Sequence, residues 1–525
     1  MSGKERAGTA WGHDREIVPV VARNVSTRTL AYVTDAAIGL LILPFNLAHL
    51  GTTAYGLWML AASVTVYFSI LDFGYGGALV RFVAEYRARR DAKGLNEILS
   101  TLFFVLVAVA AAAYAIAALI AFNLDLFFKL TPEQADTGRA ILLIVAVNVA
   151  LRMIFALYGS VIVGFQQYHL NSVTSIVTSL MVAVVNVIVL LAGYGVVALV
   201  AATTTVRLLA YAVYRLNAYQ VFPGMQLRWR SVRLNRLREV SEFGAFMFLL
   251  DWAYKLNYSA DVLVIGALIG APAVALWTPA QRLADVTLRL TNQLSEAMFP
   301  LVVDSDAGRR AERLRRIFLQ STRLSLAMTL PIAGGLVCLA RPLLTAWLGQ
   351  TFADTAVVVQ ILAAVVVIRV GSSTASIVMK GAGLHRRLTL LITFMGIANI
   401  ALSVALAGRL GLRGVAIGTL VPVGVIAIFG IFPMACRRVG VPLIRAVRQA
   451  LWPALWPAPI MAGALLLTRE QMPATLLALA LQLALAATVY FGLFLVVAID
   501  PAERHEYLRQ LRKLLPRRPQ LSVAT

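Results

Sequence analysis

Apolar runs of about 20 residues recur along the whole chain and are separated by short polar stretches. A run of this length is what a helix needs to cross a bilayer, and a lone strand would leave its backbone polar groups unsatisfied in lipid. The pattern therefore predicts an all-α polytopic membrane protein with fourteen transmembrane helices. The predicted spans are 29–48, 57–80, 100–122, 139–163, 172–192, 196–214, 243–265, 274–300, 319–340, 355–378, 389–408, 414–434, 451–468 and 475–498.

The polar stretches between these spans differ in charge from one side to the other. Of the 47 Lys and Arg residues, 34 fall in the N-terminal tail, the even-numbered loops and the C-terminal tail, and 5 fall in the opposite loops. Lys and Arg concentrate on the cytoplasmic side of membrane proteins, so both termini are predicted to be cytoplasmic. The net charge of +22 then reflects loops that face anionic headgroups, and no nucleic-acid partner is expected.

A repeat with an offset of 219 residues relates the two halves of the chain. The segment 50–58 (LGTTAYGLW) returns as 269–277 (IGAPAVALW), and the same offset links Gly195 to Gly414. Two copies of a six-helix unit with the same orientation are predicted, as in many alternating-access transporters. The expected organisation is a cytoplasmic N-tail 1–28, a first six-helix bundle 29–222, a basic cytoplasmic linker 223–242, a second bundle 243–434, helices 13 and 14 at 451–498, and a basic cytoplasmic C-tail 499–525.

Fourteen ionisable residues fall inside the predicted spans. Each would cost about 2.5–3.5 kcal/mol at a lipid-exposed helix centre, so these groups must face a wet cavity or one another. Arg282, Asp285 and Arg289 follow helical spacing on one face of the eighth span, and Asp251 and Lys255 are one turn apart on the seventh. A polar cavity between the halves is expected, with internal salt bridges that fix helix registry as the alternative.

Several short motifs resemble a known family. They are 51–58, 70–74 (ILDFG), 81–86 (RFVAEY) and 260–266 (ADVLVIG). Together they are similar to bacterial polysaccharide biosynthesis proteins, the Wzx-type oligosaccharide flippases of the multidrug/oligosaccharidyl-lipid/polysaccharide exporter superfamily. The resemblance covers nearly the whole chain.

The resemblance implies a V-shaped pair of six-helix bundles in the bacterial inner membrane. It implies transfer of an undecaprenyl-pyrophosphate-linked oligosaccharide from the cytoplasmic to the periplasmic leaflet, for O-antigen, capsule or exopolysaccharide biosynthesis. No cofactor is expected, because the family uses a proton or sodium gradient and the sequence has no nucleotide-binding motif. The expected partners are the lipid-linked oligosaccharide, membrane lipids, and the polymerase and chain-length proteins of the same pathway.

This cargo suggests roles for the intramembrane side chains, because Arg forks bind phosphate oxygens bidentately. The candidates for binding the pyrophosphate headgroup are Arg282, Arg289 and Lys255. The candidates for ion coupling or charge pairing are Asp35, Asp251 and Asp285. The candidates for sugar contacts are Trp252, Tyr254, Tyr258 and Trp277.

Four alternatives stay open. A lipid II flippase of the same superfamily shares fourteen spans, whereas a multidrug antiporter has twelve and favours carboxylates for its cationic drugs. A membrane enzyme of polysaccharide assembly needs a catalytic constellation, generally in a large loop. The outer loops here are short, the five histidines are scattered, and the two cysteines have no metal-ligand spacing. We therefore expect neither an enzyme nor a metal site. A scaffold without transport activity is the last alternative.

Overall fold

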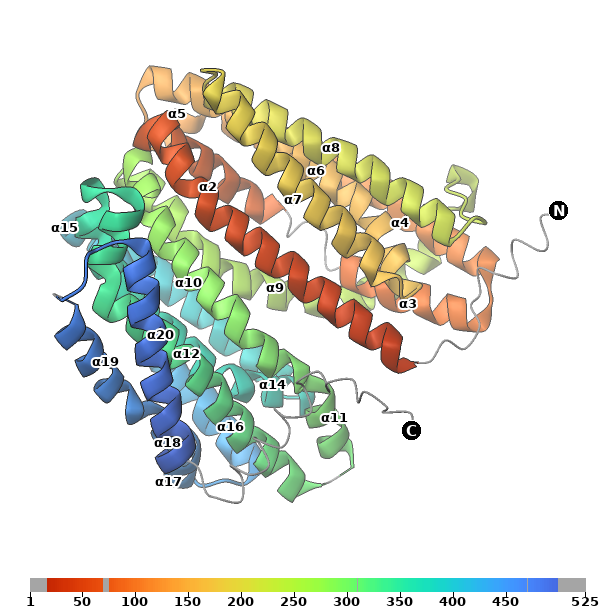
Figure 1. Cartoon of the computed structure of the whole chain (residues 1–525). Coiled ribbons are helices and arrows are strands. Elements are labelled where there is room, and N and C mark those ends of the chain that lie inside the picture. Colours follow the sequence, from red (N-terminus) through yellow and green to blue (C-terminus); the bar gives the residue numbers. More distant parts are fainter. Residues whose placement is uncertain (1–16, 69–74, 309, 470, 499–525) are drawn as a thin grey trace, which may run out of the picture. The chain divides into compact units, whose positions relative to one another are not determined.

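The computed structural model describes residues 17–68, 75–308, 310–469 and 471–498 (Figure 1). Every regular element in these ranges is a helix, and ten helical segments are long and apolar enough to cross a membrane. The predicted all-α polytopic class is therefore confirmed. The number fourteen remains a prediction, because residues 69–74 of the second predicted span lie outside the described ranges.

The chain forms two compact units, which are described separately below. The first consists of residues 1–282 and 392–419, and the second of residues 283–391 and 420–525. The division into bundles 29–222 and 243–434 that the repeat suggests remains a prediction.

The helices of the first unit are α2 (Ile17–Phe68), α3 (Tyr75–Arg89), α4 (Ala92–Phe122), α5 (Leu124–Phe127), α6 (Pro132–Gly164), α7 (Tyr168–Leu191), α8 (Val196–Val221), the 3₁₀ turn η2 (Trp229–Ser231), α9 (Leu234–Leu268), the first half of α10 (Ala271–Ala297) and the middle of α15 (His385–Val425). Those of the second unit are the rest of α10 and α15, α11 (Phe299–Ala307), α12 (Ala311–Leu348), η3 (Gln350–Thr355), α13 (Ala356–Gly371), α14 (Ser373–Gly381), η4 (Ile426–Ile431), α16 (Phe432–Val439), α17 (Leu443–Ala446), η5 (Val447–Leu451), α18 (Trp452–Leu455), α19 (Pro457–Thr468), α20 (Leu476–Leu493) and η6 (Phe494–Ala498).

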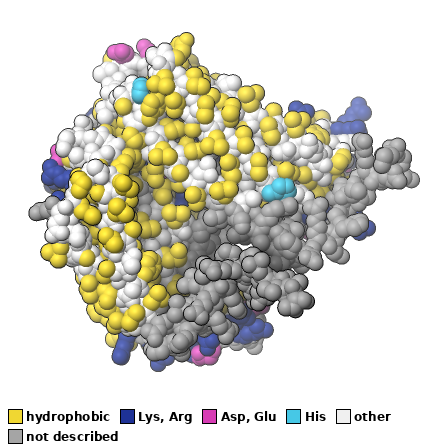
Figure 2. Space-filling model, in the orientation of Figure 1, with side chains coloured by type: hydrophobic (Ala, Val, Ile, Leu, Met, Phe, Trp, Pro, Cys, Tyr) yellow, Lys and Arg dark blue, Asp and Glu magenta, His cyan; other side chains and the backbone are white. Residues whose placement is uncertain are grey.

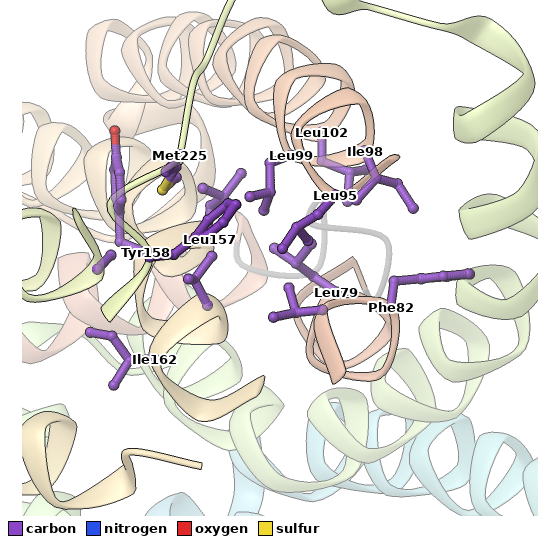
Figure 3. Close-up of a cluster of buried hydrophobic side chains, with 14 of the residues drawn as sticks. Leu79, Phe82, Leu95, Ile98, Leu99, Leu102, Leu157, Tyr158, Ile162 and Met225 are labelled. Carbon is purple, nitrogen blue, oxygen red and sulfur yellow. The ribbon is translucent and has the colours of Figure 1, made fainter. Parts of the chain in front are cut away.

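The core of the first unit is built around α6, which packs against α4 and α8. Figure 3 shows one of its two apolar clusters, where Leu79 of α3, Leu99 of α4 and Leu157 of α6 are buried together. The second cluster follows the small residues of α4, such as Ala113 and Ala117, against α6 and the later half of α2. The face seen in Figure 2 carries hydrophobic side chains over much of its described surface, with Lys and Arg mostly at its edges. This is the distribution that a lipid environment favours.

Polar contacts gather the predicted cytoplasmic loops of the first unit at one end. The Asn96 amide donates to the carbonyl of Gly224 at 2.8 Å, and Arg87 donates to the carbonyl of Gly164 at 3.2 Å. Ser100 and Thr101 accept from the backbone N–H groups of Arg228 and Arg233. Loops 81–99, 164–171 and 215–242 therefore share one end of the unit, as the charge asymmetry predicts for loops on one side of the membrane.

The second unit shows the same grouping. Arg438 of α16 pairs with Asp306 of α11 at 2.6 Å, and Arg315 of α12 donates to the carbonyl of Val439 at 3.1 Å. Its core joins α12, α19 and α20, and the buried Tyr490 hydroxyl donates to the carbonyl of Ala454 at 2.8 Å. The loops predicted to be cytoplasmic in this unit are thus also neighbours.

The internal repeat is visible in the backbone. Gly51 and Gly270, which the offset of 219 residues makes equivalent, both have positive φ angles, 71° and 122°. A helix ends or kinks at each of them. The repeated sequence therefore produces the same local break in both copies.

One test of the fold concerns Gly56, where the later half of α2 lies directly against the start of α10. A Cβ atom at Gly56 would lie 2.6 Å from the carbonyl carbon of Ala271, and backbone cannot yield as a flexible side chain can. We expect Gly56→Ala to destabilise the protein by about 1–3 kcal/mol, the usual cost of overpacking. Thermal unfolding in detergent checks this. Gly463→Ala is the matched control, because a Cβ there meets no atom within 4 Å. Equal stability of the two variants would contradict this packing.

Candidate functional site

A helical hairpin within α15 brings two polar helix faces together. Gly411 breaks the helix with φ 58° and ψ −137°, a conformation that residues with a side chain rarely adopt. The two arms then approach so closely that a Cβ at Gly418 would lie 2.6 Å from the Cα of Ser403. Glycine at this position therefore allows the polar residues of the two arms to meet.

Asp261 of α9 reaches into this hairpin. The Thr419 hydroxyl lies 3.1 Å from each carboxylate oxygen, and the Asn399 amide donates to Asp261 Oδ1 at 3.4 Å. Asp261 is 6% exposed, and Asn399 and Thr419 are 0% and 2% exposed. The carboxylate is thus deeply buried beside polar groups of both helix arms.

Two further oxygens complete this shell. Ser403 Oγ lies 3.0 Å from Asn399 Oδ1 and 3.3 Å from the carbonyl oxygen of Val415. Thr419 Oγ1 lies 3.2 Å from Asn399 Oδ1 and 3.3 Å from the same carbonyl. We call Asp261, Asn399, Ser403, Thr419 and the Val415 carbonyl the Asp261 cluster.

The Asp261 cluster is rich in acceptor oxygens. The single Thr419 proton faces four of them within 3.3 Å, although a hydroxyl can donate only once. Carboxylate, hydroxyl, amide and carbonyl oxygens gathered in one place suit a hard cation or a proton. Among the described residues there is no group of three or more His, Cys, Asp or Glu side chains for a transition metal. A light cation or a proton is therefore the chemistry that this cluster favours.

Asp261 lies in the predicted seventh span, but the sequence pattern does not predict this cluster. Charge distinguishes only Asp261, because the other members are neutral. The signal was present in the spacing, because Asn399 and Ser403 are one turn apart, as are Val415 and Thr419. Only the fold shows that α9 and both arms of α15 converge.

Arg282 has a different environment, because it lies against bare backbone. A Cβ at Gly39 of α2 would be 2.6 Å from Arg282 Cζ, so only glycine leaves room for the guanidinium there. Within the part of the chain that the structure describes, Arg282 makes no hydrogen bond or ion pair, although it interacts electrostatically with Tyr55. The exposed Asp35 lies one turn before Gly39 on the same helix. The guanidinium therefore keeps its donors available.

The other charged residues predicted for the site differ in exposure. Arg289 is exposed, and Asp285 and Lys255 are half-buried. The side chain of Asp251 lies outside the described residues. Arg289 and Asp285 belong to the second unit and Lys255 to the first. That these side chains line one cavity therefore remains a prediction.

The predicted sugar contacts differ in exposure. Trp252 is 42% exposed, and Tyr254 and Tyr258 are half-buried with ring centroids 6.1 Å apart. Trp277 is 1% exposed, and its indole N–H donates to Gln281 Oε1 at 3.0 Å. Trp277 is therefore a core residue in this conformation, and a sugar would reach it only after a rearrangement. The sugar-binding role of all four remains a prediction.

Comparison with known proteins gives these features a context. The chain is 22% identical over 403 residues to the uncharacterized membrane protein EpsK of Bacillus subtilis, covering 75% of this chain and 78% of EpsK. It is 22% identical over 408 residues to the probable flippase AglR of Haloferax volcanii, covering 76% and 80% of the two chains. Its fold is similar to an inward closed structure of the lipid II flippase MurJ, with a TM-score of 0.71, 14% identity, and coverage of 90% and 98%.

The family described as "Polysaccharide biosynthesis protein" matches residues 21–305, more than half of the 525 residues. This match includes the motifs on which the sequence resemblance was based, and the resemblance is confirmed. The chain belongs to the polysaccharide biosynthesis protein family.

Proposed function

We propose that this protein is a flippase that moves an undecaprenyl-pyrophosphate-linked oligosaccharide from the cytoplasmic to the periplasmic leaflet for surface polysaccharide biosynthesis. The family match and the similarity to a probable flippase support a transporter of lipid-linked precursors rather than an enzyme. The proposed location is the bacterial inner membrane with both termini cytoplasmic. Polymerase and chain-length proteins of the same pathway are its proposed partners.

The observation that carries the cargo proposal is the environment of Arg282. An intramembrane guanidinium is costly unless it meets water or an anion, and Arg282 has no hydrogen-bonded or ion-paired partner among the described residues. A pyrophosphate group supplies the oxygens that a planar guanidinium binds bidentately. Because Gly39 has no side chain, the guanidinium can lie directly against the backbone of α2.

The proposed energy source is an ion gradient acting through the Asp261 cluster. A proton or sodium ion bound there would meet the carboxylate and the hydroxyl, amide and carbonyl oxygens of the hairpin. Because the cluster joins α9 to both arms of α15, its occupancy would change how these helices pack. This assigns ion coupling to Asp261, in addition to the predicted residues Asp35, Asp251 and Asp285.

The cargo proposal is tested with the purified protein in liposomes that carry a fluorescent undecaprenyl-pyrophosphate oligosaccharide. Because the protein would shield the charged headgroup from the bilayer core, we expect leaflet exchange at least tenfold faster than in protein-free liposomes. A membrane-impermeant quencher measures the exchange. Parallel liposomes with lipid II, and others with an organic cation, test the two related candidates. Acceleration of lipid II or drug movement alone would replace the proposed cargo.

A further inference from the structure

Helices α6 and α8 pack side by side in the first unit (Figure 1), and two aromatic stacks fix their register. Phe155 stacks on Tyr211 with ring centroids 5.6 Å apart, and Phe165 stacks on Phe222 at 5.6 Å. Residues near 152 on α6 therefore lie at the same level as residues near 208 on α8.

Two arginines lie at that level, and both are exposed: Arg152 of α6 and Arg207 of α8. Arg152 is 11 residues before the end of its predicted span at 163, about 17 Å, and Arg207 is 7 residues before the end of its predicted span at 214, about 10 Å. Half of a typical hydrocarbon core is about 15 Å thick, so both positions lie within the predicted membrane region. A guanidinium there is costly unless it meets water or an anion.

One residue, Tyr211 of α8, connects the two helices at this level. The Tyr211 hydroxyl donates to Asn148 Oδ1 at 2.7 Å, and its ring is held by Phe155. Arg207 is one turn before Tyr211, and Arg152 is one turn after Asn148. The four residues, which we call one group, thus lie at one level of two neighbouring helices.

The donors of this group outnumber its acceptors. In the described part of the chain, Arg152 and Arg207 make no hydrogen bond or ion pair, and the Asn148 amide nitrogen donates to no acceptor. Two like charges near one tyrosine also repel each other. An anion bound between them would accept the free N–H groups and remove the repulsion.

We propose that Arg152, Arg207 and Asn148 form a binding site for a lipid-borne phosphate group, with Tyr211 as a positioning residue. This inference rests on the proposed function, since the phosphate is that of the undecaprenyl-pyrophosphate cargo in a second binding position apart from Arg282. Phospholipid headgroups offer the same chemistry, and the experiment below distinguishes the two sources.

The test is native mass spectrometry of the purified full chain in a neutral detergent, titrated separately with undecaprenyl pyrophosphate, undecaprenol and phosphatidylglycerol. We expect wild type to bind two undecaprenyl pyrophosphate molecules and no undecaprenol. Arg152→Gln with Arg207→Gln should lose one of the two. Each single substitution should weaken that second binding event about tenfold, as expected for a lost hydrogen bond to a charged group.

Two further variants test whether the loss of binding is specific to these arginines and whether Tyr211 positions the site. Arg139→Gln is the matched control, because Arg139 lies on the same helix but is already paired with Asp136 at 3.1 Å, and it should bind as wild type does. Tyr211→Phe keeps the ring stack but removes the hydroxyl contact with Asn148, and it should weaken the second binding event a few-fold.

Unchanged binding in the double variant would overturn this inference and leave the proposed function intact. Loss of phosphatidylglycerol binding alone would assign the site to bilayer phospholipid instead of cargo, which also overturns the proposal. Wild type that binds no undecaprenyl pyrophosphate would contradict both the site and the proposed function.

Discussion

Asp261→Asn is expected to remove ion-driven exchange and to slow gradient-dependent transport at least tenfold. The substitution keeps the shape of the side chain but removes the charge that a cation or proton would neutralise. It should also remove the stabilisation that the coupling ion gives to the folded protein. For wild type, an ion at 100 times its dissociation constant would contribute about 2.7 kcal/mol.

Thermal unfolding against Na⁺ concentration and against pH measures this effect. Wild type should become more stable with one of the two ions, and Asp261→Asn with neither. Thr419→Ser keeps the hydroxyl and is the matched control. An Asp261→Asn protein that still responds to the ion like wild type would show that the cluster is not the coupling site.

Arg282→Ala and Gly39→Ala are expected to slow exchange of the pyrophosphate-linked cargo to a similar extent, about tenfold or more. The first removes the guanidinium. The second places a methyl group where the guanidinium lies, and the end of the flexible arginine side chain must move away. Because only that flexible end moves, Gly39→Ala should reduce activity with little loss of stability.

The exchange assay and thermal unfolding together check this pair. Gly463→Ala is the control, since its added methyl group meets no neighbouring atom and should leave exchange unchanged. If Gly39→Ala flips the cargo at the wild-type rate while Arg282→Ala does not, the guanidinium acts from another position. If both variants keep the wild-type rate, Arg282 does not bind the headgroup.

The features set by local composition could be predicted from the sequence. The helical class follows from apolar run lengths, and the repeat follows from matched glycines such as Gly51 and Gly270, which share the positive φ angle. The grouping of basic loops follows from charge, as the contact between Arg438 and Asp306 illustrates in the second unit.

The features that depend on convergence of distant segments could not be predicted. Asp261 and Thr419 are 158 residues apart, and no periodicity connects them. The role of Gly39 depends on the placement of Arg282, which lies on another helix. Arg152 and Arg207 lie on different helices, and only the packing of α6 against α8 shows that they are at one level.

The most direct test of the central claim is leaflet exchange of the fluorescent undecaprenyl-pyrophosphate oligosaccharide by wild type under an imposed Na⁺ or proton gradient. An ion-coupled flippase should move the cargo faster, and in one direction, when one of the two gradients is present, and collapse of that gradient with an ionophore should abolish the effect. Exchange that is absent under every gradient, or equally fast with and without one, would contradict the account.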